Sequence, residues 1–124
     1  MAKIPRISEA EWQVMDVLWQ RSPQTANEVV EALAEAVEWE PATIKTMLNR
    51  LVKKGALKFK TEGNRYFYAP ALTRDACVRT EGRSFLDRVF GGAAGPLIAH
   101  FVEDANLSKD EITELRRLLD RKGR

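Results

Sequence analysis

The chain has 124 residues, of which 44% are hydrophobic and 31% are charged, and its formal net charge is only +2. This length suits one domain, or one small domain with an oligomerisation region, and the composition is ordinary for a soluble globular protein. Its single cysteine, Cys77, excludes an intrachain disulfide and suits a reducing compartment. The chain starts without a signal-peptide pattern and has no apolar run of about 18 residues, so we expect a cytoplasmic protein without a membrane segment.

The charges are distributed unevenly along the chain. Residues 8–40 contain eight acids against Arg21 alone, a net charge of −7. Residues 41–65 contain seven bases against Glu62 alone, a net charge of +6. This split indicates that one face of the protein meets a polyanion, although a solvated helix followed by a solvated hairpin would carry the same charges.

Three helices are predicted before residue 55. Residues 8–11 form a capping box, and apolar residues at helical spacing follow it until the sequence Arg21-Ser22-Pro23. A second capping box at residues 25–28 begins a helix that we expect to reach Ala36. Pro41 suits the first turn of a third helix, expected to end at Lys54 before a glycine cap. The three tryptophans lie among helical apolar residues or where a helix begins, and we expect them to pack in the core.

The periodicity then changes from helical to alternating. Leu57 to Thr61 alternates apolar and mostly basic residues, residues 62–65 form a tight turn, and Tyr66 to Ala69 form a returning strand closed by Pro70. Three short helices followed by a basic hairpin is the element order of a winged helix-turn-helix. The predicted fold class is therefore mainly α with a small β-hairpin, with a winged helix at residues 1–71.

Residues 72–124 are predicted to form a helical dimerisation domain. Their helices have apolar stripes that are too short to make a core alone, and two-fold symmetry would then match a palindromic operator. The alternative is a tail that folds back on its own winged helix. The apolar residues expected to form the dimer are Phe85, Leu86, Val89, Phe90, Leu97, Ile98, Phe101, Ile112, Leu115, Leu118 and Leu119.

The third predicted helix is the candidate recognition helix, because its free face is polar and basic. Its threonine, asparagine and arginine side chains suit base edges, and its lysines suit phosphates. Lysines of the hairpin also suit DNA, although they can instead protect an edge strand from aggregation. Helix and wing are expected to meet double-stranded DNA as one surface. The predicted DNA-binding residues are Thr43, Lys45, Thr46, Asn49, Arg50, Lys53, Lys58, Lys60 and Arg65.

Motifs along nearly the whole chain support this interpretation. The segments at residues 7–12, 39–46, 48–55 and 66–68, together with Phe101-Val102-Glu103, resemble the family of penicillinase and methicillin-resistance repressors, which includes copper-transport repressors. The resemblance implies a homodimer with an N-terminal winged helix and a three-helix dimerisation domain, repressing genes at a palindromic operator. In the β-lactam branch a membrane sensor-peptidase signal leads to cleavage of the dimerisation domain. In the copper branch paired cysteines bind metal.

The sequence departs from both branches. Cys77 and His100 cannot supply the four ligands of a closed metal site, so we expect no metal, no cofactor and no copper sensing. Cys77 is more simply a small buried apolar residue. The pair that matches the Asn-Phe cleavage position of the β-lactam branch is His100-Phe101, in which only the phenylalanine is kept. These two residues are the candidate proteolytic switch, with a regulatory peptidase as partner; an ordinary packed or surface histidine is the alternative.

The sequence therefore predicts a DNA-binding repressor of a β-lactam-resistance or stress operon. The alternatives are a winged-helix regulator that responds to an unrelated signal and a winged-helix module that binds only proteins. We expect no enzyme, because one histidine, one cysteine and the lack of a phosphate-cradling glycine loop offer little for catalysis.

Overall fold

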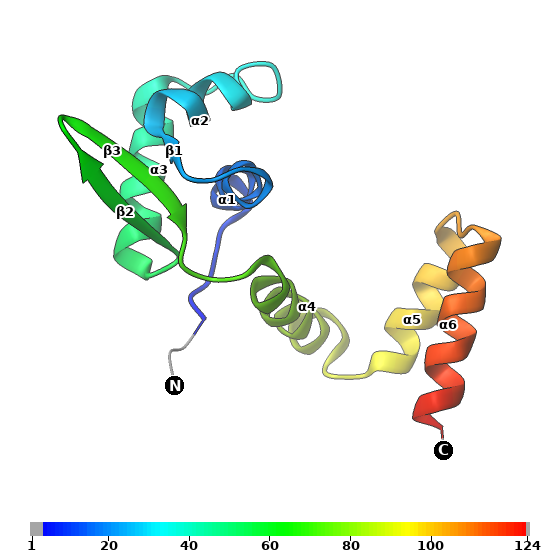
Figure 1. Cartoon of the computed structure of the whole chain (residues 1–124). Coiled ribbons are helices and arrows are strands. Elements are labelled where there is room, and N and C mark those ends of the chain that lie inside the picture. The colour runs from blue at the N-terminus through cyan, green and yellow to red at the C-terminus, as the bar shows by residue number, and fades with distance from the viewer. Residues whose placement is uncertain (1–3, 124) are drawn as a thin grey trace. The chain divides into compact units, whose positions relative to one another are not determined.

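The computed structural model describes residues 4–123 and has the predicted fold class, mainly helical with a small antiparallel sheet. Among these residues no helix combines the length and the apolar character needed to cross a membrane. The elements in chain order (Figure 1) are α1 (Glu9–Gln20), β1 (Gln24–Thr25), α2 (Ala26–Leu33), α3 (Pro41–Lys54), β2 (Leu57–Glu62), β3 (Arg65–Pro70), α4 (Arg74–Phe90), α5 (Ala94–Asp104) and α6 (Lys109–Lys122).

The helix boundaries follow from local capping chemistry. Ser8 and Thr25 each cap a helix through a capping box, in which the cap hydroxyl accepts a backbone N–H and the glutamate three residues later accepts the N–H of the cap residue. Pro41 begins α3, where its missing N–H leaves no helical bond unmade. Gly55 ends α3 at φ 85°, a left-handed conformation that glycine adopts without a Cβ penalty. These predicted boundaries are confirmed.

Two details differ from the sequence prediction. Helix α2 ends at Leu33 rather than Ala36, because the chain tightens into a turn in which the N–H of Ala34 donates to Glu31 and that of Ala36 donates to Leu33. The two-residue strand β1 was not predicted, since it is too short to show an alternating pattern. It exists because β3 offers a free edge for pairing.

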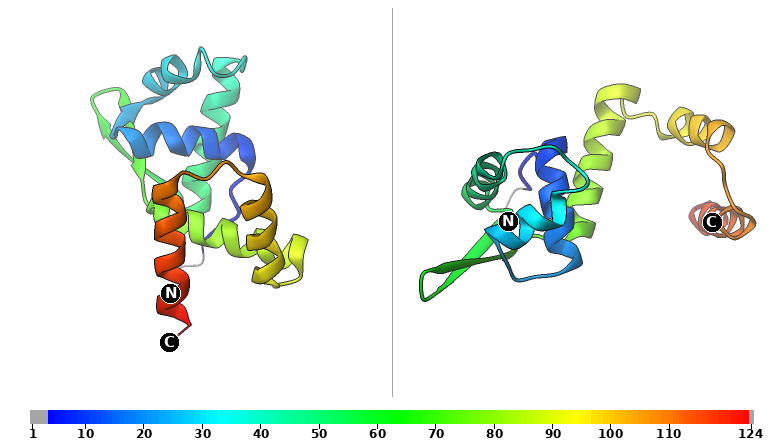
Figure 2. Two further views of the ribbon diagram at one scale, coloured as in Figure 1. Left: turned by 90° about the vertical axis from the view of Figure 1, so that its right-hand side faces the viewer. Right: turned by 90° about the horizontal axis from the view of Figure 1, so that it is seen from above.

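The sheet has the strand order β1-β3-β2 and is antiparallel throughout. In the β2–β3 hairpin Phe59 lies opposite Tyr68 and Lys60 lies opposite Phe67, so the hairpin has one aromatic face and one face with both lysines. Tyr66 and Tyr68 share a face and Phe67 lies on the other. The tip of the hairpin projects beyond helices α1–α3 in Figures 1 and 2.

One hydrophobic core holds the three helices and the sheet together. The three tryptophans are partly buried and pack against this core, as expected, with Trp12 and Trp19 in an edge-to-face arrangement 5.4 Å apart. The buried residues of the core are Ile7, Val14, Met15, Leu18, Val29, Leu33, Ile44, Met47, Leu48, Leu51, Ala56, Leu57, Tyr68 and Cys77.

The chain divides into two compact units within α4, the first ending at Gly82 and the second beginning at Arg83. The sequence placed the domain boundary earlier, at residues 71–72. The first turns of α4 belong to the first unit because Cys77 is only 2% exposed within the winged-helix core. Arg74 also pairs with Asp16 of α1 at 3.4 Å. Cys77 is thus a buried apolar residue, as predicted, and burial raises the pKa of its thiol.

The second unit exposes most of its apolar side chains. No residue of α5 or α6, both of which are fully described, is buried. Phe101 is 51% exposed and Leu119 is 57% exposed, and Ile98, Ile112, Leu115 and Leu118 are exposed as well. An apolar surface of this kind is typical of a region that is covered by a partner.

Candidate nucleic-acid interface

Helix α3 has two faces of opposite character. Ile44, Met47, Leu48 and Leu51 are buried in the core and fix the rotation of the helix about its axis. The predicted contact residues of this helix all lie on the free side and are exposed: Thr43, Lys45, Thr46, Asn49, Arg50 and Lys53. The structure therefore brings six of the nine predicted DNA-binding residues together on one helix surface. Such a surface can enter a major groove.

The hydroxyl of Thr46 has a partner within its own helix. It donates a hydrogen bond of 2.9 Å to the carbonyl of Ala42, one turn earlier. Its lone pairs remain able to accept a hydrogen bond from a base amino group, but the hydroxyl must rotate before it can donate.

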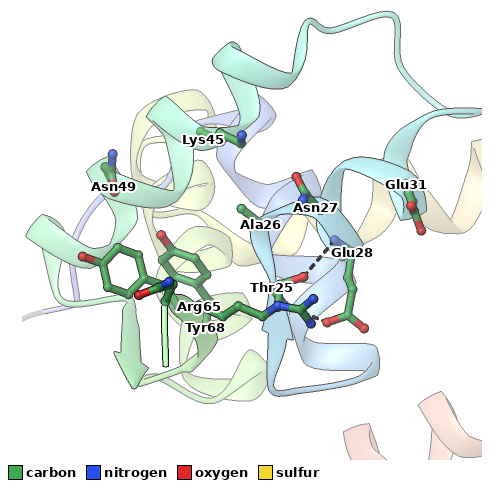
Figure 3. A pocket seen from close by; sticks show the side chains of 11 residues that line it. Thr25, Ala26, Asn27, Glu28, Glu31, Lys45, Asn49, Arg65 and Tyr68 are labelled. Atoms are coloured by element: carbon green, nitrogen blue, oxygen red, sulfur yellow. Dashed lines mark hydrogen bonds between the residues drawn. The ribbon is translucent and has the colours of Figure 1, made fainter. Parts of the chain in front are cut away.

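A groove of about 580 Å³ lies between α2, α3 and the hairpin tip (Figure 3). Lys45 and Asn49 of α3 line it, and Asn64 and Arg65 line it from the tip. The start of α2, capped by Thr25, lines it on another side. The groove thus combines two cations with amide side chains and the positive end of a helix dipole, a set of groups that suits a phosphate.

Acidic residues of α2 moderate this positive potential. Glu28 and Glu31 line the same groove. Hydrogen bonds from Thr25, and then the nearby guanidinium groups of Arg21 and Arg65, hold the pKa of Glu28 below its ordinary value. Glu28 is therefore an anion at neutral pH, and the side chain of Arg65 extends toward it in Figure 3.

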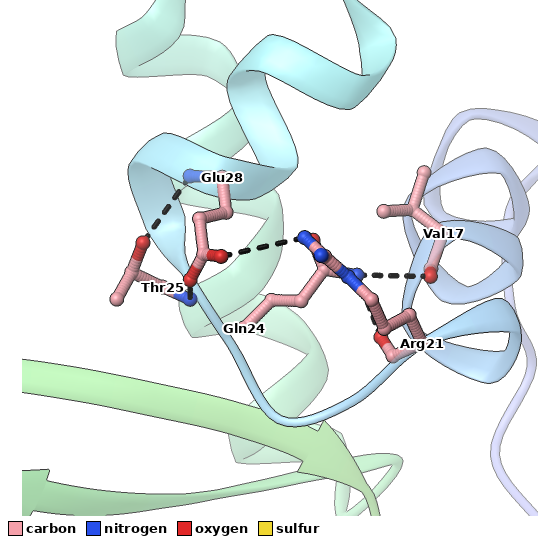
Figure 4. A network of polar contacts seen from close by, with 5 residues as sticks. All are labelled: Val17, Arg21, Gln24, Thr25 and Glu28. Carbon is pink, nitrogen blue, oxygen red and sulfur yellow. Dashed lines mark hydrogen bonds and ion pairs between the residues drawn. The ribbon is translucent and has the colours of Figure 1, made fainter.

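The turn before α2 is held by the buried amide of Gln24 (Figure 4). Its Nε2 donates to the carbonyls of Val17, at 3.2 Å, and Arg21, at 2.6 Å. Arg21 in turn pairs with Glu28 at 3.3 Å. This network links the end of α1 to the first turn of α2. It thereby fixes the position of the N-terminus of α2 beside the groove.

The two wing lysines lie elsewhere on the hairpin. Lys58 and Lys60 share the face opposite to Phe59 and Tyr68, and they line a separate groove of about 490 Å³ with Pro23. Both lysines are exposed. Of the three predicted wing residues, only Arg65 lines the groove next to α3.

Several groove residues were absent from the sequence prediction. Asn27 of α2 and Asn64 of the hairpin tip line the groove, as do Tyr66 and Tyr68 of β3. The asparagines carry no charge and so added nothing to the charge count. The sequence assigned the tyrosines no binding role, and the structure leaves Tyr66 54% exposed and Tyr68 only 7% exposed. All four residues lie beside α3 because of how the hairpin and α2 pack against it, and the sequence alone does not give this packing.

Known proteins resemble this chain over almost its full length. A family model described as penicillinase repressor matches residues 7–121. The penicillinase repressor of Bacillus licheniformis is 41% identical over 120 residues, which cover 97% of this chain and 94% of that protein. The methicillin resistance regulatory protein MecI of Staphylococcus aureus strain N315 is 36% identical over 121 residues, which cover 97% and 98% of the two chains.

A solved structure also matches. It is the solution structure of the monomeric form of Bacillus licheniformis BlaI in complex with the blaP half-operator, and the TM-score is 0.53 at 47% identity. The match covers 60% of this chain and 92% of that chain. The chain therefore belongs to the penicillinase repressor family of non-enzymatic, DNA-binding transcriptional repressors.

Proposed function

We propose that this repressor acts in the cytoplasm as a homodimer on a palindromic operator that controls β-lactam-resistance genes. The observation that carries the proposal is the exposed polar and basic face of α3 beside the groove that holds Lys45 and Arg65. Phosphate contacts from such cations position a protein on DNA, and base contacts from Asn49 and Arg50 specify the sequence.

The DNA-reading part of the proposal draws on the relative of known structure. That relative, BlaI, was solved with the blaP half-operator. At 47% identity the two chains share the winged-helix scaffold, so we propose the same type of contact for this chain. The DNA-contacting residues that we propose for this chain are Thr43, Lys45, Thr46, Asn49, Arg50, Lys53, Lys58, Lys60 and Arg65.

The dimer in the proposal is supported by the second unit. Helices α5 and α6 have apolar side chains at helical spacing and bury none of them, and each exposed apolar side chain costs free energy in water. A second copy of the unit would cover these surfaces. Two linked half-site contacts also bind far more tightly than one, which makes dimerisation useful for repression.

The proposal is tested by selecting duplexes from a random-sequence library and measuring their affinity for the protein at several salt concentrations. We expect one inverted-repeat sequence to be enriched and its affinity to fall steeply as salt rises, because phosphate contacts release counterions. Sedimentation of the complex should give two chains per duplex. Absence of binding to any duplex at low salt would favour the protein-interaction module instead.

The signal that releases the operator is a separate part of the proposal. A regulatory peptidase would cut at His100-Phe101, in the middle of α5. Because both residues are helical, α5 must unwind before a peptidase can bind this segment in an extended form. Unwinding would also separate the His100 ring from the carboxylate of Asp104, which lies 3.3 Å away one turn later. Incubation of the protein with cells that are induced by a β-lactam, followed by mass spectrometry of the fragments, tests this site. An intact chain that nevertheless leaves its operator would favour an unrelated signal.

A further inference from the structure

The carboxylate of Glu11 is buried where α1 begins. The residue is 1% exposed, which is unusual for a glutamate. Its Oε1 accepts the backbone N–H of Ser8 at 2.9 Å and the ammonium group of Lys54 at 2.5 Å. Its Oε2 has no hydrogen-bond partner within residues 4–123. The buried negative charge therefore depends mainly on Lys54 for its compensation.

Lys54 is the last residue of the recognition helix α3. Besides Glu11, its ammonium donates to the backbone carbonyl of Arg6 at 2.9 Å. Two of its three N–H donors are thus engaged on the side of α1, and its side chain is only 29% exposed. The neighbouring Lys53 is exposed and belongs to the free face of the helix.

The pair connects two parts of the chain that are far apart in sequence. Glu11 and Lys54 are 43 positions apart. The apolar contacts of α3, which include buried Leu51 three residues before Lys54, hold the helix in the core, but they are non-directional. The Glu11–Lys54 bond adds a directional, charge-assisted contact at the last residue of the helix. This contact resists displacement, because movement of the ammonium group would leave a buried carboxylate without a partner.

We propose that Glu11 and Lys54 form a positioning pair, which holds the end of the recognition helix at the angle needed for base contacts, and that Lys54 does not bind DNA itself. The inference rests on the proposed function. Lys54 is the one base among the seven of residues 41–65 that is not among the predicted DNA contacts, and the inference gives it a different role. The inference also predicts that a neutral residue in place of Glu11 weakens sequence discrimination, although Glu11 does not line the groove.

The test compares Lys54→Met with the matched variant Lys53→Met of the adjacent lysine. The probes are the duplex that the wild-type protein selects from a random library and a scrambled duplex of the same composition. For each variant, affinity is measured against salt concentration, with the folded fraction determined by circular dichroism. Glu11→Gln, Lys54→Arg and the double variant Glu11→Gln/Lys54→Met complete the set.

We expect Lys54→Met to leave the slope of log affinity against log salt unchanged and to reduce the preference for the selected duplex about tenfold, the effect of about one misread base pair. Lys53→Met should lower the slope by about 0.9 for one lost phosphate contact. Glu11→Gln should reproduce the loss of preference, the double variant should lose no more than either single variant, and Lys54→Arg should retain the preference.

Two results would overturn the inference while leaving the proposed function intact. One is a salt slope that falls as much in Lys54→Met as in Lys53→Met, which would make Lys54 a phosphate ligand. The other is an unchanged preference per folded molecule in both Lys54→Met and Glu11→Gln, which would make the pair merely structural. A wild-type protein that prefers no duplex would instead contradict the proposed function, and this inference with it.

Discussion

The indole of Trp19 in α1 donates a hydrogen bond of 3.0 Å to the backbone carbonyl of Leu72, 53 positions later in the chain. This bond ties the segment that leaves the hairpin to the first helix, immediately before α4 begins. Together with the Asp16–Arg74 ion pair it explains why the first turns of α4 belong to the winged-helix unit.

Replacement of Trp19 by Phe tests this connection. The variant keeps an aromatic ring in the partly buried site but removes the N–H donor, and the carbonyl of Leu72 loses its partner. We expect the free energy of unfolding to fall by about 1–3 kcal/mol. Urea denaturation measures this change. Trp12→Phe is the control, because the structure records no hydrogen bond from the Trp12 indole within residues 4–123; an equal loss in both variants would assign the effect to ring size.

Arg50 is expected to read a base. It is exposed on the free face of α3, with Asn49 beside it in sequence. Arg50→Ala should weaken binding to the selected operator by about 1–3 kcal/mol and leave binding to scrambled DNA nearly unchanged. Fluorescence anisotropy with both duplexes measures the two affinities. Arg79→Ala removes an exposed arginine from α4 and serves as the control. An equal loss on both duplexes would make Arg50 a phosphate contact.

Leu115 is expected to lie in the dimer interface. Its side chain is 38% exposed on the apolar side of α6. Leu115→Asp would place a charge in that interface, where burial without a partner is costly, and should convert dimer to monomer. Sedimentation velocity gives the mass. Thr113→Asp introduces the same charge two residues away, roughly on the opposite side of the helix, and should remain dimeric. An unchanged mass for Leu115→Asp would refute the role of α6.

The stability of the first unit should depend on the charge of Glu11 in acid. Burial by itself raises the pKa of Glu11, but hydrogen bonds from Lys54 and Ser8 outweigh it and hold the pKa below the ordinary value of 4.5. A lowered pKa means that the ionised form stabilises the fold. This stabilisation is fully present above the unfolded pKa of 4.5 and is lost as pH falls through the lower, folded value.

Urea denaturation of the wild type and Glu11→Gln between pH 7 and pH 3 tests this dependence. Glutamine does not titrate, so the wild type should be the more stable protein at pH 7 and the difference should shrink below pH 4.5. A difference that stays constant over the whole range would show that Glu11 does not act through its charge.

Most of the local structure of the DNA-binding unit could be predicted from its sequence. Capping boxes at Ser8 and Thr25, Pro41 at the start of α3 and Gly55 at its end act through contacts within a few residues, so their effect is visible in the chain. The change from helical to alternating periodicity located the hairpin for the same reason. The apolar side of α3 also implied its exposed side, because one helix cannot bury both.

Other features depend on contacts between residues that are far apart in the chain, and these could not be predicted from the sequence. The pairing of β1 with β3 and the packing of Cys77 in the first unit follow from contacts between separate elements. The position of Arg65 next to α3, with Lys58 and Lys60 on the other groove, follows from how the hairpin packs. The burial of Glu11 under Lys54 has the same origin: a capping glutamate is ordinarily solvated, and only the packing of α1 against α3 makes it a buried charge.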